Sequence, residues 1–322
     1  MCGVLHLRAI VPSDRVDTVC GRLRDNPGVT NLVVLPGAAL RPAGDLILCD
    51  VAREAANDVI ADLRGLGIEH DGSIALERVD LSISDVAKQA AHRAPGHGDD
   101  AVVWDEIDRR TAEETKITWA FVAFLALATQ LAGIAAIIDS PILIVGAMVL
   151  GPEFGAVAAI SYGILFGDLR RIALATRTLA IGFGIAITIT FVCALVSRWI
   201  GVIELDELPA ERALTGFVYS PDRWSFIVAL LAGAAGVLSL TAGKSSALVG
   251  VFISVTTVPA AGNLAVAVAL RHWNEVNGSL LQLGVNLSGM ILAGTATMLA
   301  QKAGWALVRK KGAGLPRGSS AG

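Results

Sequence analysis

The chain has 322 residues, of which 54% are hydrophobic and 17% charged, and its mean hydropathy is +0.62. Soluble globular proteins are less apolar and more highly charged, so this composition excludes that class and indicates a membrane protein. A net charge of −3, without a basic segment that carries interleaved aromatic residues, gives no sign of nucleic-acid binding.

Charge density changes at Ile117, where long apolar runs separated by short polar turns begin. We therefore expect four parts: a soluble domain over 1–81, a linker and polar helix over 82–116, a membrane domain over 117–305 and a basic tail over 306–322. The N-terminal sequence MCGVLHLRAIVP lacks the pattern of a secretory signal, so the soluble domain is expected to stay in the cytoplasm.

The first part alternates between β-rich runs and segments of helical periodicity. The expected strands are 4–11, 30–35, 45–51 and 73–79, and the expected helices are 14–25 and 54–66. Ser13 is the expected cap of the first helix, and residues 36–44 read as a loop rich in proline and glycine. The order βαββαβ predicts an α+β ferredoxin-like domain, which either binds a metabolite or only docks and self-associates.

Neither the cysteines nor the residues near the linker form the pattern of a metal site. The four cysteines lack ligand spacing and are expected to be reduced thiols: Cys2, Cys20, Cys49 and Cys193. A loop rich in proline and glycine would not hold the nearby candidate ligands in fixed geometry: His92, His97, Asp99 and Asp100. No metal and no cofactor is expected.

Six apolar segments are each near the ~20 residues that a bilayer core requires. They are 117–138, 142–166, 172–196, 224–241, 247–270 and 279–300. The connections on one side hold 12 Lys and Arg residues and those on the other hold 4, which predicts that both termini are cytoplasmic.

The second segment is interrupted near its middle by the sequence Gly151-Pro152-Glu153-Phe154-Gly155. Proline removes a backbone donor and clashes with the preceding turn, so a helix must break there. A carboxylate at that depth is costly unless it faces protein or water.

The last three segments repeat the first three. Trp119 and Trp224 are 105 residues apart, as are Ser140 and Ser245, while Gly146 pairs with Gly250 at 104 and Pro152 with Pro259 at 107. Because each unit has three spans, the copies must be inverted, which is the plan of many secondary transporters. The alternative is that Pro259 only kinks a packed helix and that the small residues only aid packing.

Two segments carry a family resemblance: SPILIVGAMVLGPEFG at 140–155 and GKSSALVGVFISVTTVPAA at 243–261. They resemble the signature segments of an uncharacterised bacterial membrane-protein family, domain of unknown function 389. The resemblance covers the six-span region fully and the soluble domain more loosely. It implies a multi-pass protein of the bacterial inner membrane and brings no substrate. Glu153 departs from it, since many members have an apolar residue there.

The sequence lacks a nucleophile elbow, a phosphate loop, an HExxH motif and a redox CxxC motif, so we do not expect an enzyme. Polar and backbone-breaking residues instead gather at the two interruptions and on the first and last spans. The candidate site residues for a solute or ion are Gly151, Pro152, Glu153, Gly155, Thr256, Thr257, Pro259, Asn263, Gln130, Asn286 and Ser288. Hydroxyls and amides in membrane helices often bond neighbouring backbone, so it is their clustering at the breaks that favours a site.

Two functions stay open. The first is a transporter or channel for a small solute or ion; the second is a membrane-anchored sensor whose soluble domain binds a metabolite. Glu153 likewise has two roles open, as a coupling residue that binds a proton or cation and as a simple helix cap. Sheet edges and spans rich in Gly and Ala predict a homo-oligomer in contact with membrane lipid.

Overall fold

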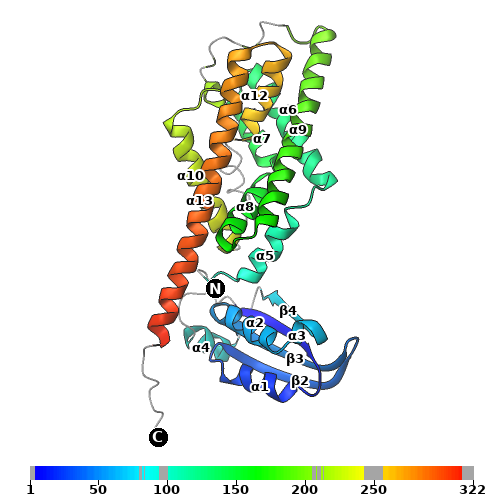
Figure 1. Ribbon diagram of the computed structural model, residues 1–322, viewed down its shortest axis with the longest axis vertical. Helices are drawn as coiled ribbons and strands as arrows, with labels where there is room; N and C mark the ends of the chain where they lie inside the picture. The colour runs from blue at the N-terminus through cyan, green and yellow to red at the C-terminus, as the bar shows by residue number, and fades with distance from the viewer. Residues whose placement is uncertain are drawn as a thin grey trace. The chain divides into compact units, whose positions relative to one another are not determined.

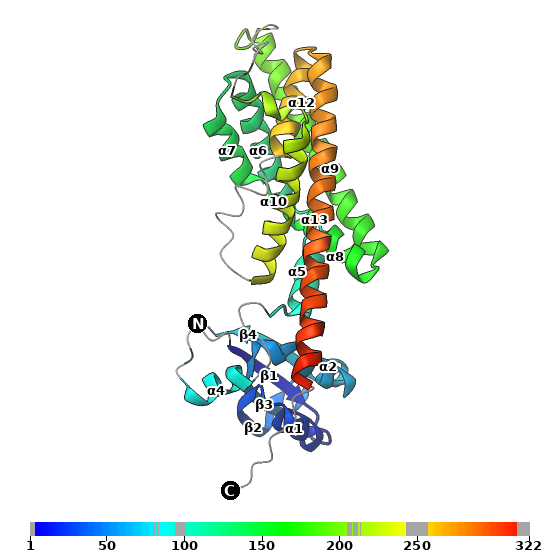
Figure 2. The same cartoon turned by 90° about the vertical axis from the view of Figure 1, so that its left-hand side faces the viewer.

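The computed structural model describes residues 4–79, 82, 84–93, 101–204, 208, 212, 214–242 and 257–313. The chain divides into two compact units, which are described separately (Figures 1 and 2). The first comprises residues 1–106 with 302–322 and is called the sheet unit, and the second comprises 107–301 and is called the helical unit.

The sheet unit is built on four strands in the order β2-β3-β1-β4, with all neighbours antiparallel. The strands are β1 (Val4–Val11), β2 (Val29–Leu40), β3 (Ala43–Ala52) and β4 (Ser73–Arg78). Side chains alternate between the faces of a strand, and Leu7, Ala9 and Val11 of β1 are accordingly all buried. The four strands expected in the N-terminal part are therefore present, and they form one antiparallel sheet.

Helices α1 (Val16–Asp25) and α2 (Ala56–Gly65) pack into the same core as β1 and β3. Val19, Leu23, Val59 and Leu63 are buried at helical spacing. The short helix α3 (Ile68–Asp71) then leads into β4.

Two local predictions for this unit were wrong. The predicted loop 36–44 is mostly strand, because β2 continues to Leu40 across an irregularity in its pairing with β3. Gly37 takes a positive φ of 60° there, and its amide donates to Asp45 Oδ1 at 2.9 Å, so the strand passes the proline without a loop. Ser13 does not cap α1 either, since its hydroxyl donates to Asp45 at 2.9 Å.

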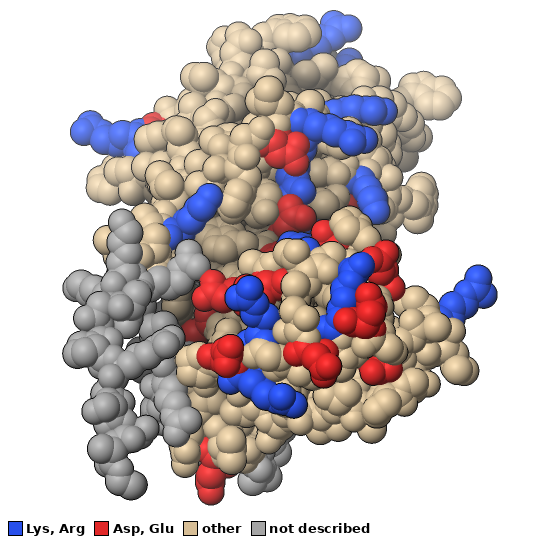
Figure 3. Space-filling view, turned by 60° about the horizontal axis from the view of Figure 1, so that its bottom comes forward, with Lys and Arg blue, Asp and Glu red and all other residues tan. Residues whose placement is uncertain are grey.

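The segment predicted as a linker packs in part on the sheet unit. Helix α4 (Asp85–Arg93) contacts β2 and β3. The Asn57 side-chain amide donates to the Val102 carbonyl at 2.8 Å and accepts from the Trp104 amide at 3.1 Å. Acidic and basic side chains are interspersed on the face of this unit seen in Figure 3. Helix α5 (Trp104–Glu113) begins here and continues into the helical unit.

Four helices of the described chain are long and apolar enough to cross a membrane. They are α6 (Trp119–Ile137), α9 (Leu169–Trp199), α10 (Arg223–Ala242) and α13 (Trp273–Ala313). A bent pair, α7 (Pro141–Leu150) and α8 (Phe154–Phe166), makes a fifth span if it is counted as one. These helices indicate a multi-pass membrane protein.

The break predicted at Pro152 is present, since α7 ends at Leu150, α8 begins at Phe154 and the two are bent by 57°. Most of the fifth predicted span, residues 247–256, lies outside the described residues. Its remainder forms α12 (Val258–Ala269), which is too short to cross a bilayer alone. The count of six spans and the inverted repeat therefore stay predictions.

Helix α12 lies at the centre of the helical unit, packed against α6, α7 and α9. Its residues are buried on all sides except at Val268. A methyl group at Gly262 would collide with Ala132, with the Gly133 amide and with the Thr129 carbonyl, so only glycine lets α12 approach α6 this closely.

The sheet-unit core can be tested through its own thiol. Cys49 is fully buried, and burial, with Asp50 adding repulsion, raises the pKa of its thiol to about 12. The thiol therefore reacts with an aqueous reagent at pH 8 only after the unit opens. Removing buried Leu63 should cost about 2–5 kcal/mol, so Leu63→Ala should speed labelling of Cys49, as the sole cysteine, at least tenfold.

Leu40→Ala is the matched control, because the Leu40 side chain is 91% exposed. It should leave the labelling rate within about twofold of its original value. An equal rate in both variants would contradict this core.

Candidate functional site

The break at Pro152 meets the start of α12 at Glu153 and Thr257. The Thr257 hydroxyl donates to Glu153 Oε1 at 2.5 Å, and both residues are fully buried. Glu153 is the N-cap residue of α8, and Thr257 is the N-cap residue of α12. One carboxyl group thus lies where two buried helices begin.

The first turn of a helix has amide donors without partners inside the helix and carries a partial positive charge. Two such ends near Glu153 favour a negative charge on its carboxyl group. The Glu153 side chain makes no capping hydrogen bond to α8, so its role as a simple helix cap is not supported.

The contacts around the break explain why glycine occupies positions 151 and 155. Gly151 ends α7, with its amide donating to the Met148 carbonyl. A methyl group at Gly155 would collide with the Glu114 side chain, so the absence of a side chain there admits this second carboxyl group to the start of α8. Burial beside this break, with repulsion from Glu113, raises the pKa of Glu114.

A second buried polar cluster surrounds Arg212, whose side chain is fully buried. Its guanidinium donates to Asn263 Oδ1 at 2.7 Å, forms a short ion pair with Glu275 and lies 4.4 Å from the centre of the Tyr219 ring. The Asn263 amide group donates in turn to Ser279 Oγ at 2.9 Å and to Glu275 Oε2 at 3.2 Å. A buried ion pair is tolerated only when such bonds offset its desolvation.

Asp139 anchors the segment that follows Arg212. Its carboxylate accepts from the Thr215 hydroxyl at 2.7 Å and from the amides of Thr215 and Leu214 at 2.8 and 3.3 Å. The Thr215 hydroxyl, more than the two amides, lowers the pKa of Asp139. This anchor holds the connection between α9 and α10 against the end of α6.

Helix α13 presents a row of buried polar side chains, the α13 polar stripe: Glu275, Ser279, Gln282 and Asn286. Their spacing of four, three and four residues places them on one helix face. The stripe begins in the Arg212 cluster, and Gln282 Nε2 donates to Asn286 Oδ1 at 3.5 Å. Each member is at most 8% exposed, so the stripe does not face lipid.

The candidate residues predicted from sequence fall into separate places. Glu153 and Thr257 are in contact, Gly151, Pro152 and Gly155 flank the first break, and Pro259 opens α12. Asn263 belongs to the Arg212 cluster and Asn286 to the α13 polar stripe. Gln130 is half-buried on α6, and Thr256 lies outside the described residues.

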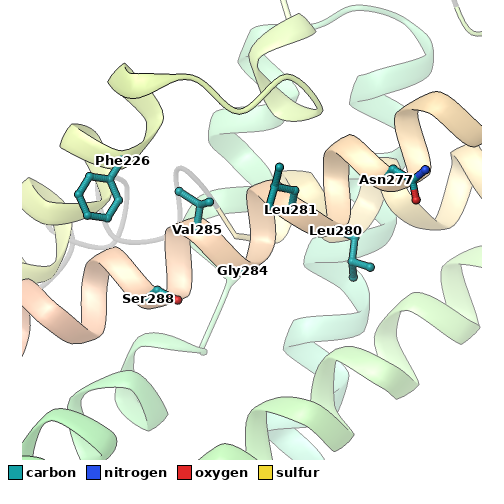
Figure 4. Close-up of a pocket in the computed structure, with 7 residues that line it drawn as sticks. All are labelled: Phe226, Asn277, Leu280, Leu281, Gly284, Val285 and Ser288. Carbon is teal, nitrogen blue, oxygen red and sulfur yellow. The ribbon is translucent and has the colours of Figure 1, made fainter.

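Ser288 is on the exposed side of α13. It lines an open apolar groove of about 550 Å³ with Phe226 of α10 and five further residues of α13 (Figure 4). The groove belongs to a different face of α13 from the stripe, so Ser288 does not join the buried polar groups.

Sequence reasoning missed four members of the Arg212 cluster and the α13 polar stripe: Arg212, Glu275, Ser279 and Gln282. Glu275, Ser279 and Gln282 could have been identified from the sequence, because they are polar residues that recur on one face of an otherwise apolar helix. Arg212 has no such signal, because it follows no periodic segment and reaches its partners only through the fold.

Among the residues that the structure describes, no group of three or more His, Cys, Asp and Glu side chains could hold a metal ion. Of the four residues considered near the linker, His97, Asp99 and Asp100 fall outside that set, and the His92 side chain is likewise not described.

The family model described as "Domain of unknown function (DUF389)" matches residues 148–292. That range begins at the end of α7 and contains the break at Pro152, Arg212, α12 and the α13 polar stripe. A protein of Methanocaldococcus jannaschii, described as uncharacterized, is 24% identical over 159 residues. The match covers 48% of this chain and 47% of that protein, about half of its length.

No solved structure matches this chain. The family match over residues 148–292 confirms the resemblance seen in the two signature segments.

Proposed function

We propose that this chain is a secondary transporter or channel for a small solute or ion, with its site between the two interrupted segments. One observation carries the proposal, the 2.5 Å hydrogen bond from Thr257 to Glu153 deep inside the helical unit. In inverted-repeat transporters, paired broken helices meet in the middle of the membrane, and their free backbone ends bind the solute or ion.

The place of this contact supports an inverted repeat. Glu153 follows Pro152, the proline of the first break, and Thr257 lies two residues before Pro259, the matched proline of the second repeat. The pairing of Pro152 with Pro259 makes Ala260, and not Thr257, the counterpart of Glu153. The contact therefore joins corresponding regions of the two proposed repeats, as expected where paired broken helices meet.

Glu153 is the proposed coupling residue. A carboxyl group buried among membrane helices is costly and is usually retained for function. The two helix starts favour its ionised form, whereas burial favours its protonated form, so a proton or a small cation could switch its state. A change in the charge of Glu153 would alter the hydrogen bond from the Thr257 hydroxyl, since that hydroxyl donates directly to the carboxylate.

Transport can be tested in proteoliposomes with a pH-sensitive dye and a series of monovalent cations. Glu153→Gln keeps size and hydrogen bonding but removes the charge, so proton-coupled or cation-dependent flux should fall at least tenfold, about 1.4 kcal/mol. Thr257→Val deletes a donor to a charged group, worth about 1.5–3 kcal/mol, and should weaken flux comparably.

Glu113→Gln is the control, because that side chain is 65% exposed on α5. Normal flux in Glu153→Gln with unchanged pH dependence would remove Glu153 from the mechanism. Absence of flux in every preparation, together with a metabolite that binds residues 1–80, would favour the sensor instead.

The finer architecture is also proposed. Six spans are proposed from the six apolar segments, cytoplasmic termini from the uneven distribution of Lys and Arg, and a bacterial inner membrane from the family resemblance. The order βαββαβ with strands β4-β1-β3-β2 supports a ferredoxin-like sandwich. A homo-oligomer is proposed on the exposed apolar surfaces of the spans.

Topology can be tested with single cysteines in a chain that lacks its native thiols. A cysteine at Ser220 should react with an impermeant reagent added outside the cell, and one at Ser319 only after the membrane is opened. Reaction of both from the same side would remove the odd number of spans between them and, with it, the inverted repeat.

A further inference from the structure

The α13 polar stripe is not needed to hold α13 in a membrane. An apolar helix buries apolar residues at lower cost, because each buried polar group must find a partner. The stripe runs from Glu275 to Asn286, about 16 Å along the helix at ~1.5 Å per residue. That length is roughly half of a bilayer core of ~30 Å.

Gln282 is the member of the stripe that points to a ligand. It is 2% exposed, and its Oε1 atom has no hydrogen-bond partner among the described residues, whereas its Nε2 atom donates to Asn286. A buried amide oxygen accepts a hydrogen bond or coordinates a cation. The chemistry that suits this position is a small solute that donates hydrogen bonds or carries a positive charge.

The stripe is closed at one end by the ion pair between Arg212 and Glu275. Arg212 lies between α9 and α10, while Glu275 lies in the first turn of α13, so the pair ties a connecting segment to the start of the stripe. The Arg212 side chain is fully buried, Tyr219 covers its guanidinium, and Asn263 accepts a hydrogen bond from it. The pair therefore fills the end of the stripe, seven residues before Gln282.

Helix α12 connects this closure to the break. Its N-cap residue Thr257 binds Glu153, and Asn263, six residues later, binds both Arg212 and Ser279. Six residues are about 9 Å of helix. Because α12 is buried almost completely, a shift at one of these contacts must move the other.

We propose that the α13 polar stripe lines one half of the solute path, with Gln282 as a binding group, and that the Arg212–Glu275 ion pair is the gate at its end. The gate opens when the pair separates and the segment after Arg212 moves away from α13. This inference rests on the proposed function, since a gate has a purpose only if solute moves.

The test measures access rather than transport. A cysteine replaces Gln282 in the full-length chain without its native thiols, and its rate of reaction with the small cationic reagent methanethiosulfonate ethylammonium is measured. Leu281→Cys is the matched control, because Leu281 is the adjacent residue and is 59% exposed. Both rates are then measured after Arg212 and Glu275 are changed together to glutamine, which leaves no unpaired buried charge.

The gate predicts slow labelling at position 282 in the original background and a rise of about tenfold or more in the paired Gln variant. Labelling at 281 should not change. An unchanged rate at 282, or an equal rise at both positions, would overturn the gate.

If the variant with glutamine at both 212 and 275 does not fold, a second variant tests the gate. Asp139→Asn leaves the ion pair in place and weakens the half-buried anchor that holds Leu214 and Thr215. It should raise labelling at 282 by a smaller factor, about threefold, since one charge-assisted anchor is lost. If labelling does not rise, the gate is overturned.

The charge of the reagent tests the ligand class. The ratio of the labelling rate by the cationic reagent to that by the anionic reagent methanethiosulfonate ethylsulfonate should be larger at position 282 than at position 281, and a smaller ratio at 282 would contradict a path for cations or hydrogen-bond donors. Flux without labelling of position 282 would refute this path but would not contradict the proposed transport function. Labelling without flux would support the path and refute the transporter.

Discussion

The structure of the helical unit depends on the buried hydrogen bond between Thr257 and Glu153. A carboxyl group without a partner would cost several kcal/mol at that depth, about 3 or more on insertion scales. The hydroxyl and the starts of α8 and α12 offset that cost together. These groups come together only where the break at Pro152 meets the start of α12, and the helices around both are packed about that contact.

Small residues allow α12 and the break at Pro152 to pack closely against their neighbours. Glycine at 262 and alanine at 132 let α12 lie against α6, and glycine at 155 makes room for Glu114 beside the first break. The buried helix α12 then carries one polar contact at Thr257 and another at Asn263. Two polar clusters joined by one tightly packed helix are suited to a change of state, since packed interiors transmit displacement instead of absorbing it.

Features that depend on one residue or on local periodicity could be predicted from the sequence, whereas features that depend on distant partners could not. The break at Pro152 follows from the backbone of that residue alone, and β1 and α2 follow from periodicity. The extension of β2 past Pro36 depended on a bond from Gly37 to Asp45, which no local pattern reveals. Arg212 was missed because its partner Glu275 is 63 residues away, although the spacing of Glu275, Ser279 and Gln282 could have been recognised.

The most direct test of this arrangement is a cross-link between the two breaks. Cysteines at 153 and 257, in a chain without native thiols, should be joined within one chain by a short bifunctional thiol reagent, and mass spectrometry of the digested protein should show the linked peptides. A control pair at 153 and the exposed position 281 should not be linked. Failure of the 153–257 pair to link in folded protein, with both thiols reactive, would contradict the meeting of the two breaks.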